Sequence, residues 1–176
     1  MLLTVTKEDY INSVLSIKNK LFSYSFKMLH SRQEAEDVVQ DVLVKVWEMR
    51  NSSQTINNLE AWCMTMTRNK SLDKLKLKSR NSVEIESRYD LATDDSSPFR
   101  VAEMNDLKKK LRKVVDTLPL NQREVIQLRD FQGRSYKEIS EIMGVDMNLV
   151  KVTLHRARQV IKKEILKLST YGLKSS

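Results

Sequence analysis

The sequence predicts an all-α protein made of two small helical domains joined by a flexible acidic linker. Its 176 residues include only three Gly and two Pro, too few for a turn-rich β fold. Apolar residues recur at helical spacing on both sides of the middle of the chain. Between them, residues 81–104 hold six acids, two bases and few large apolar side chains, a composition that is typical of a linker.

Three helices are predicted before this linker. An imperfect apolar stripe over 11–29 indicates the first helix. Ser31 and Glu34 form a capping box that opens the second helix. Its apolar positions follow the helical period closely: Ala35, Val38, Val39, Val42, Leu43, Val46 and Trp47. A polar loop over 51–58 then precedes a third helix, from about 59 to 80.

The second half is predicted to contain four helices. The first covers 107–118 and stops at Pro119, and the second starts at Asn121 with Glu124 three residues on. Ser135 and Glu138 form another capping box, which opens a third helix. That helix ends at Gly144, and Asp146 caps the last helix. A short helix, a tight turn containing Gly and a second helix form a helix-turn-helix signature.

The composition argues against an enzyme. One cysteine, Cys63, and two histidines cannot supply four nitrogen or sulfur ligands to zinc, and the three glycines are isolated from one another. Cys63 lies in an apolar helical stretch and is expected to be a buried structural thiol. The longest run without a charged residue has nine residues, so we expect no membrane insertion. We therefore expect a non-catalytic cytoplasmic protein without cofactor, metal or small-molecule substrate.

The last helix has two contrasting faces. Its apolar face consists of Val150, Leu154, Ala157 and Ile161. The opposite face carries long donor side chains and one apolar one: Asn148, Lys151, Val152, His155, Arg156 and Gln159. Such a face can reach base edges and phosphates in a major groove, and Arg158 is placed for a phosphate. A merely solvated face is the alternative, but residues 105–176 hold 16 bases and 8 acids, which favours DNA binding.

The predicted third helix is a second candidate nucleic-acid surface. Its basic residues are Arg68, Lys70, Lys74, Lys76, Lys78 and Arg80, with Asp73 as the only acid among them. This run favours sequence-independent phosphate binding. Trp62, beside the polar loop with Asn57 and Asn58, is able to stack an unpaired base, although burial in the core is the more common use of a tryptophan at this spacing.

The predicted second helix is acidic, with Glu34, Glu36, Asp37, Asp41 and Glu48 around Lys45. Because an acidic surface repels DNA, this face is expected to meet a basic protein partner or to be simply solvated.

Three blocks of sequence resemble bacterial sigma factors. The run 35–43, ending in Trp47, looks like their core-polymerase-binding helix. The stretch Ala61-Trp62, with Arg68-Asn69 and Asp73-Lys74, is similar to their promoter-melting and −10 region. The blocks 118–125, 135–139 and 150–158 look like their −35-binding region. The small size, with these two regions only, resembles the extracytoplasmic-function group of the sigma-70 family.

The resemblance implies a division of labour. Residues 1–80 would be sigma region 2, 81–104 the linker and 105–176 sigma region 4. Asp37, Gln40 and Asp41 match positions that contact core RNA polymerase. The −10 strand would meet the loop and the third helix, through Asn57, Asn58, Trp62, Arg68, Asn69, Lys70 and Lys74. The −35 element would meet Lys151, Val152, His155 and Arg156, with Asn148 and Arg158 beside them. An anti-sigma factor is a further partner that the family implies.

The sequence departs from the family at two places. Met147-Asn148-Leu149 stands where the family often has a small or Glu-Gly-Thr-like run, and Thr153 stands where it has Arg. These departures concern the −35 sequence rather than the docking mode. Two other interpretations are a helix-turn-helix repressor or activator with an N-terminal sensing or dimerisation domain, and an interaction scaffold. The capped helix-turn-helix weighs against the scaffold, and the pairing of an acidic helix with a basic one weighs against the repressor.

Overall fold

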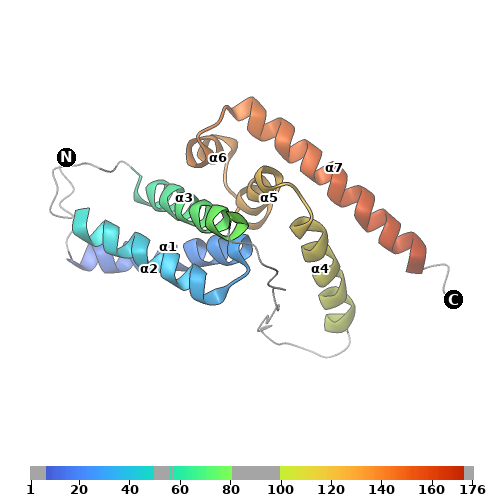
Figure 1. The fold of residues 1–176 in the computed structure, drawn as a ribbon, viewed down its shortest axis with the longest axis horizontal. Coiled ribbons are helices and arrows are strands. Elements are labelled where there is room, and N and C mark those ends of the chain that lie inside the picture. Colours follow the sequence, from blue (N-terminus) through green and yellow to red (C-terminus); the bar gives the residue numbers. More distant parts are fainter. Residues whose placement is uncertain (1–6, 50–55, 57, 81–99, 173–176) are drawn as a thin grey trace. The chain divides into compact units, whose positions relative to one another are not determined.

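The computed structural model describes residues 7–49, 56, 58–80 and 100–172, and these residues form helices and short connections without a strand (Figure 1). The all-α prediction is confirmed. In chain order the elements are α1 (Lys7–Leu29), α2 (Arg32–Met49), α3 (Leu59–Arg80), α4 (Arg100–Asp116), α5 (Leu120–Ile126), the π-helical turn η1 (Gln127–Phe131), α6 (Tyr136–Met143) and α7 (Met147–Gly172).

Contacts divide the described chain into two compact units. The first contains α1, α2 and α3 together with residues 137–145, and the second contains α4, α5, η1, Tyr136 and α7. α4 begins at Arg100, within the segment 81–104 that the composition assigns to a linker. Residues 81–99 lie outside the described part of the chain.

In the first unit, α1, α2 and α3 pack against one another around a core that all three supply. Leu21, Tyr24 and Met28 of α1 are fully buried, as are Cys63 and Met64 of α3. From α2 the buried residues are Ala35, Val38, Val39, Val42 and Val46. The apolar spacing of α2 therefore predicts its buried side correctly, except that Leu43 is half-buried and Trp47 is 36% exposed.

The connection between α1 and α2 is short and capped on both sides. His30 adopts a positive φ of 55°, and its amide donates to the Phe26 carbonyl at 2.9 Å, which ends α1. The Ser31 hydroxyl accepts from the Glu34 amide at 3.4 Å, the half of the predicted capping box that opens α2. This tight corner sets α2 directly beside α1.

The second unit buries an apolar cluster from α5, η1 and α7. Val125, Ile126 and Leu128 are 2% exposed or less. From α7, Val150, Leu154 and Ala157 are buried to the same degree, as the helical spacing predicts. α7 packs against both α4 and α5, so these residues fix which side of α7 faces solvent.

The predicted start of α5 at Asn121 is wrong. α5 begins at Leu120, with Pro119 at the N-cap position, and the Pro119 carbonyl accepts from the amides of Gln122 and Arg123 at 2.9 and 3.0 Å. The Asn121 side chain accepts from the next amide, that of Gln122, at 2.9 Å. Glu124, three residues on, is buried, with 2% exposure. The preceding proline therefore decides the helix start.

Residues 144–146 make the predicted turn between α6 and α7. Gly144 has a φ of +66°, which suits a residue without a Cβ, and the Val145 amide donates to the Ser140 carbonyl at 3.1 Å. The Asp146 carboxylate accepts from the Asn148 amide at 2.7 Å, which confirms Asp146 as the cap of α7.

Candidate functional site

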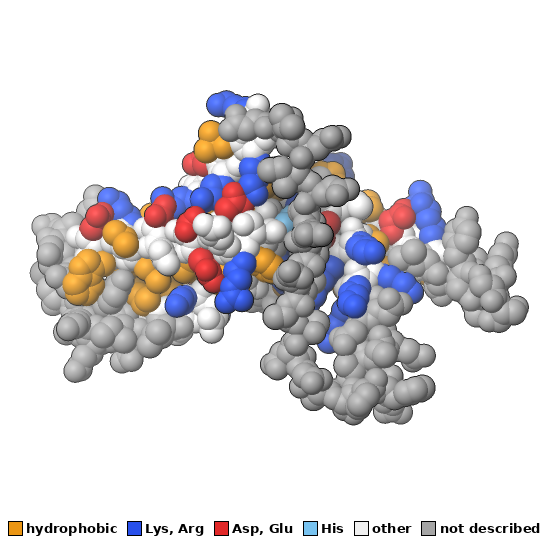
Figure 2. Space-filling model, turned by 60° about the horizontal axis from the view of Figure 1, so that its bottom comes forward, with side chains coloured by type: hydrophobic (Ala, Val, Ile, Leu, Met, Phe, Trp, Pro, Cys, Tyr) orange, Lys and Arg blue, Asp and Glu red, His pale blue; other side chains and the backbone are white. Residues whose placement is uncertain are grey.

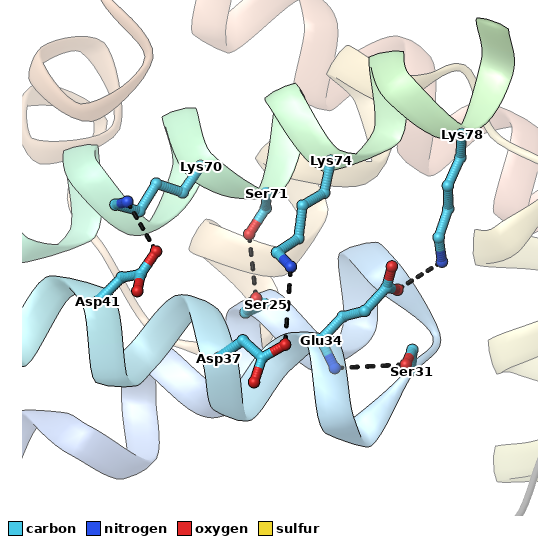
Figure 3. Close-up of polar contacts among 9 residues, drawn as sticks. All are labelled: Ser25, Ser31, Glu34, Asp37, Asp41, Lys70, Ser71, Lys74 and Lys78. Atoms are coloured by element: carbon cyan, nitrogen blue, oxygen red, sulfur yellow. Dashed lines mark hydrogen bonds and ion pairs between the residues drawn. The ribbon is translucent and has the colours of Figure 1, made fainter. Parts of the chain in front are cut away.

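Three ion pairs connect α2 to α3 along their length (Figure 3). Asp41 pairs with Lys70 at 2.9 Å, and Asp37 pairs with Lys74 at 3.8 Å. Glu34, one turn earlier on α2, pairs with Lys78, one turn later on α3. The carboxylates advance along α2 while the lysines step back along α3, so the two helices run antiparallel here. We call these six side chains the charge ladder.

The charge ladder joins two surfaces that the sequence alone presents as separate. Asp37 and Asp41 are candidate polymerase contacts, and Lys70 and Lys74 are candidate −10 contacts; the structure brings each acid to one lysine. The signal for this arrangement is present in the sequence, as carboxylates at helical spacing on α2 and lysines every fourth residue on α3. What the sequence lacks is the register of one helix against the other.

The exposed side of α2 continues beyond the ladder with apolar residues. Gln40, the third candidate polymerase contact, is exposed. Val44 and Trp47, four and seven residues further on, are 57% and 36% exposed. The solvent-facing side of α2 thus combines carboxylates, an amide and two large apolar side chains, a mixture that is typical of a protein-binding surface.

The other candidate −10 residues lie along α3 or just before it. Asn58 caps α3, since its Oδ1 accepts from the Ala61 amide at 3.0 Å. Trp62 and Arg68 are half-buried, and Asn69 is exposed. Asn57 lies outside the described residues, as does most of the polar loop 51–58. α3 therefore carries a half-buried aromatic ring near its start and cationic side chains further along.

Buried contacts hold α3 against the rest of the first unit. The hydroxyls of Ser25 on α1 and Ser71 on α3 lie 3.0 Å apart, and both residues are fully buried. Cys63 is fully buried, as expected, and this burial raises the pKa of its thiol to about 12, with a further rise from the Glu60 carboxylate. The thiol is therefore protonated and structural rather than nucleophilic.

α7 presents its predicted DNA-facing residues to solvent. Lys151, Val152, His155 and Arg156 are exposed, as is Asn148 in the first turn. Thr153, the position where the family resemblance implies Arg, is only 7% exposed and lies on the packed side. The exposed face therefore holds three side chains able to carry positive charge and one apolar side chain, Val152.

Arg158 is bonded within the protein. Its Nε and Nη2 donate to the two carboxylate oxygens of Asp130, with an Nε to Oδ2 distance of 3.1 Å. The hydrogen bonds that Arg158 donates to Asp130 raise the pKa of Arg158, while desolvation by burial acts in the opposite direction. A DNA phosphate would have to compete with this carboxylate for the guanidinium group. Asp130 lies in the π-helical turn η1. The sequence pattern predicts only the end of an ordinary helix at this place.

Tyr136 is a residue that the sequence analysis does not single out. The Arg129 guanidinium carbon lies 4.8 Å from the centre of its ring, and the Lys151 ammonium lies 5.9 Å from it. Both distances are within the range of cation–π contacts. Arg129 also donates to the Arg134 carbonyl at 2.6 Å. The tyrosine ring therefore helps to place Lys151, one of the candidate −35 contacts.

Acidic and basic side chains intermingle on the visible face of the left-hand part of Figure 2, with apolar side chains beside them. This agrees with the charge ladder, in which opposite charges lie next to each other rather than in separate patches. Among the described helices, none combines the length and apolarity that crossing a membrane requires.

Two known protein families match successive parts of the chain. Residues 14–81 match the family described as Sigma-70 region 2, and residues 108–161 match Sigma-70, region 4. The first match spans the charge ladder up to Arg80, and the second spans η1, α6 and the exposed face of α7.

Curated relatives carry names that agree with these matches. The extracytoplasmic-function (ECF) RNA polymerase sigma factor SigE of Mycolicibacterium smegmatis is 26% identical over 160 residues, which cover 90% of this chain and 62% of that protein. The RNA polymerase sigma factor YlaC of Bacillus subtilis is 28% identical over 156 residues, which cover 84% of this chain and 87% of YlaC. The chain thus spans under two thirds of SigE and most of YlaC.

A solved sigma factor structure has a similar fold. The sigma factor RpoE of Bartonella quintana, solved in complex with the anti-sigma factor NepR, is 27% identical, with a TM-score of 0.73 over 90% of this chain and 97% of RpoE. CnrH, solved with the cytosolic domain of CnrY, has a TM-score of 0.66 at 20% identity and supports the fold alone. With both regions present in order, the chain belongs to the sigma-70 family of RNA polymerase sigma factors, in its extracytoplasmic-function group, and it directs promoter-specific transcription initiation.

Proposed function

We propose that this sigma factor divides its contacts among three helices. α2 binds core RNA polymerase through Asp37, Gln40 and Asp41. α3 and the loop before it hold the opened −10 strand, and α7 docks the −35 duplex. The observation that supports this division is the position of the described candidate residues, which are exposed or half-buried at or near helices within the two matched regions.

The polymerase contact on α2 is supported by the chemistry of its exposed side. Asp37 and Asp41 retain 54% and 60% side-chain exposure even within their ion pairs, so a cationic partner can reach them. Val44 and Trp47 add apolar surface on the same helix. A partner helix with basic residues and an apolar stripe fits this combination.

The −10 contact is supported by the row of cations on α3. Lys70 and Lys74 follow Trp62 by eight and twelve residues on α3. A helix that carries both a ring and cations can stack an unpaired base on the ring while the cations bind the phosphates of the strand. Asn57 and Asn58 would contribute from the loop, Asn58 through groups other than the oxygen that caps α3. Binding separated strands lowers the free energy of the open promoter without any bond chemistry.

The −35 contact is supported by the separation of faces on α7. Val150, Leu154 and Ala157 are buried, which leaves Lys151, Val152, His155 and Arg156 to the solvent side. A lysine or arginine can bind guanine at O6 and N7, and an apolar side chain can contact a thymine methyl group. We expect Asn148 to reach a base edge and Arg158 a phosphate once it leaves Asp130.

The protein itself supplies binding and positioning, while the polymerase performs nucleotidyl transfer; this role needs no cofactor or small-molecule substrate, and its site is the cytoplasm, where the polymerase and the chromosome lie. RpoE and CnrH were each solved with a protein partner, and the partner of RpoE is named as an anti-sigma factor. We propose that an anti-sigma factor likewise binds this chain.

The decisive experiment is reconstituted transcription with purified core polymerase and a library of promoter sequences. We expect the protein to enrich transcripts from a discrete set of promoters that share a −10 and a −35 element. If it gives no promoter-specific initiation, yet binds specific duplex DNA tightly without polymerase, the chain acts as a helix-turn-helix repressor or activator instead.

A further inference from the structure

The charge ladder joins residues to which the proposed function gives two different partners. Asp37 and Asp41 are assigned to the polymerase, whereas Lys70 and Lys74 are assigned to the DNA strand. Each lysine is already neutralised by a carboxylate within the protein. The field that would attract a phosphate is weaker as long as that pair persists.

We propose that the charge ladder withholds the lysines of α3 from nucleic acid until a cationic partner takes the carboxylates of α2. Polymerase binding and strand binding by the first unit are then coupled through shared ion pairs. Coupling of this kind is reciprocal, so a bound strand also strengthens binding of the cationic partner. The identity of the two partners rests on the proposed function; the exchange itself rests on the geometry of the ladder.

The ladder is built to exchange partners without unfolding. Its side chains remain between 26% and 60% exposed, so both a phosphate and a basic side chain can approach them. Exposed ion pairs contribute little to folding stability, so opening them costs little. The packing of α3 relies instead on buried groups such as the Ser25–Ser71 hydroxyl pair.

The salt dependence of strand binding distinguishes a lysine that must leave a carboxylate from a lysine without an ion pair. A free lysine that binds a phosphate releases a condensed cation from the nucleic acid, which makes affinity fall as salt rises. A lysine that leaves a carboxylate exposes that carboxylate, which then attracts a cation from solution. The two effects oppose each other, so the ladder is expected to weaken the salt dependence of strand binding.

The test compares two double variants of the full chain without polymerase. Asp37→Asn with Asp41→Asn removes two carboxylates from the ladder. Glu36→Gln with Glu48→Gln removes the same charge from the same helix, but these residues pair within α2, with Arg32 at 2.9 Å and Lys45 at 3.3 Å. Binding of a fluorescein-labelled oligo-dT strand is measured by anisotropy over a series of salt concentrations.

We expect the ladder variant to bind the strand about fivefold more tightly than the control variant at low salt. The slope of log affinity against log salt should steepen by about 1.4, which corresponds to two additional phosphate contacts on a single strand. Adding Glu34→Gln, which frees Lys78, should steepen it by about a further 0.7. Urea midpoints of both double variants should stay close to that of the wild type.

Equal affinities and equal slopes for the two double variants would overturn the proposal. Transcription by the wild-type protein separates this result from failure of the proposed function. If the wild type initiates at promoters while the ladder variant behaves like the control, the sigma function stands and the coupling is wrong. If the ladder variant gains strand affinity but the wild type initiates nothing, the exchange stands and the assignment of the polymerase as partner is wrong.

Discussion

Arg156 illustrates how a single side chain can carry promoter recognition. It is exposed on α7, and its neighbour Ala157 is fully buried, so the backbone at this point is anchored while the guanidinium group faces solvent. Arg158, two residues on, is held by Asp130. Arg158 would have to leave Asp130 before it could bind DNA. We therefore expect Arg156, rather than Arg158, to contact a base edge.

Arg156→Ala should weaken binding to the preferred −35 duplex by about 1–3 kcal/mol and relax the base preference at one position. The matched control is Lys167→Ala, which removes one positive charge from the same helix, three turns further on, where the lysine pairs with Glu164 at 2.7 Å. Titration of duplexes with single base changes gives both values. Equal losses for the two variants would mean that Arg156 contributes only its charge.

The buried thiol of Cys63 gives a prediction on pH. Its pKa rises from 9.0 to about 12 in the folded protein, so between these values the folded thiol keeps a proton that the unfolded chain releases. The folded state then binds more protons, and the stability contributed by the neutral thiol falls as pH rises above about 9.

Cys63→Ala removes this dependence along with the sulfur atom. At pH 7.5 the variant should be less stable by about 1 kcal/mol, because a small cavity replaces the sulfur. The difference in unfolding free energy between the wild type and the variant should become smaller at pH 10, because only the wild type has a thiol that ionises on unfolding. Urea denaturation of both proteins at the two pH values measures this difference. A difference that does not change with pH would contradict the raised pKa of Cys63.

At the scale of elements, the position of α3 on α1 depends on a buried polar contact. The hydroxyls of Ser25 and Ser71 share one hydrogen bond, at 3.0 Å, and both residues are fully buried. Replacing either serine by alanine leaves a buried hydroxyl without this partner, which should cost about 1–3 kcal/mol. Ser25→Ala with Ser71→Ala should cost much less than the sum of the single variants.

Equilibrium unfolding of the two single variants and the double variant measures this coupling. Additive losses would show that the hydroxyls do not depend on each other. Binding of oligo-dT should remain the same in the double variant, since the lysines of α3 keep their places when the helix packing is preserved.

An exposed ion pair also joins η1 to α7. Arg158 and Asp130 retain 51% and 34% side-chain exposure, so their bidentate contact should contribute only about 0.5–1 kcal/mol to stability. A double-mutant cycle with Asp130→Ala and Arg158→Ala measures this value. The same cycle on Glu164 and Lys167, a pair within α7, should give a smaller coupling, because it does not connect two elements.

The sequence predicts the elements better than it predicts the contacts between them. Helical spacing identifies the buried sides of α2 and α7, such as Val38, Val42 and Leu154, because that pattern is local. Asp37–Lys74 and Asp130–Arg158 depend on the register of helices far apart in sequence, which no local pattern reports. At Pro119 two local signals compete for one helix start, and the proline carbonyl prevails over the Asn121 side chain.

The candidate site follows the same distinction. The solvent side of α7 could be derived from periodicity, whereas the roles of Asp37, Gln40 and Asp41 came only with the family resemblance. The position of Lys151 over Tyr136 could not be derived, since a cation and a ring fifteen positions apart meet only after folding. The roles of these residues in polymerase and promoter binding stay predictions.

For the whole molecule, the distribution of charge matters more than its sum. The chain holds 31 bases and 23 acids, and an even spread of this excess would give only weak, unspecific attraction to DNA. In the first unit, lysines of α3 are neutralised by carboxylates of α2. On α7 of the second unit, Lys151, His155 and Arg156 share a solvent-facing side. We therefore expect the free protein to meet duplex DNA mainly through α7, and the opened strand only together with the polymerase.

This division predicts that polymerase binding and −35 recognition can be separated by mutation. Asp37→Arg with Asp41→Arg places two like charges against a cationic partner, so binding to core polymerase should weaken by about 2 kcal/mol or more. The affinity ratio between a −35 duplex and a scrambled duplex should stay the same, because the side chains proposed to contact bases lie on α7, in the other unit. The released lysines raise binding to both duplexes equally. Glu36→Arg with Glu48→Arg is the matched control for the charge reversal. A variant that lost polymerase affinity and −35 discrimination together would show that α2 and α7 do not act as separate contacts.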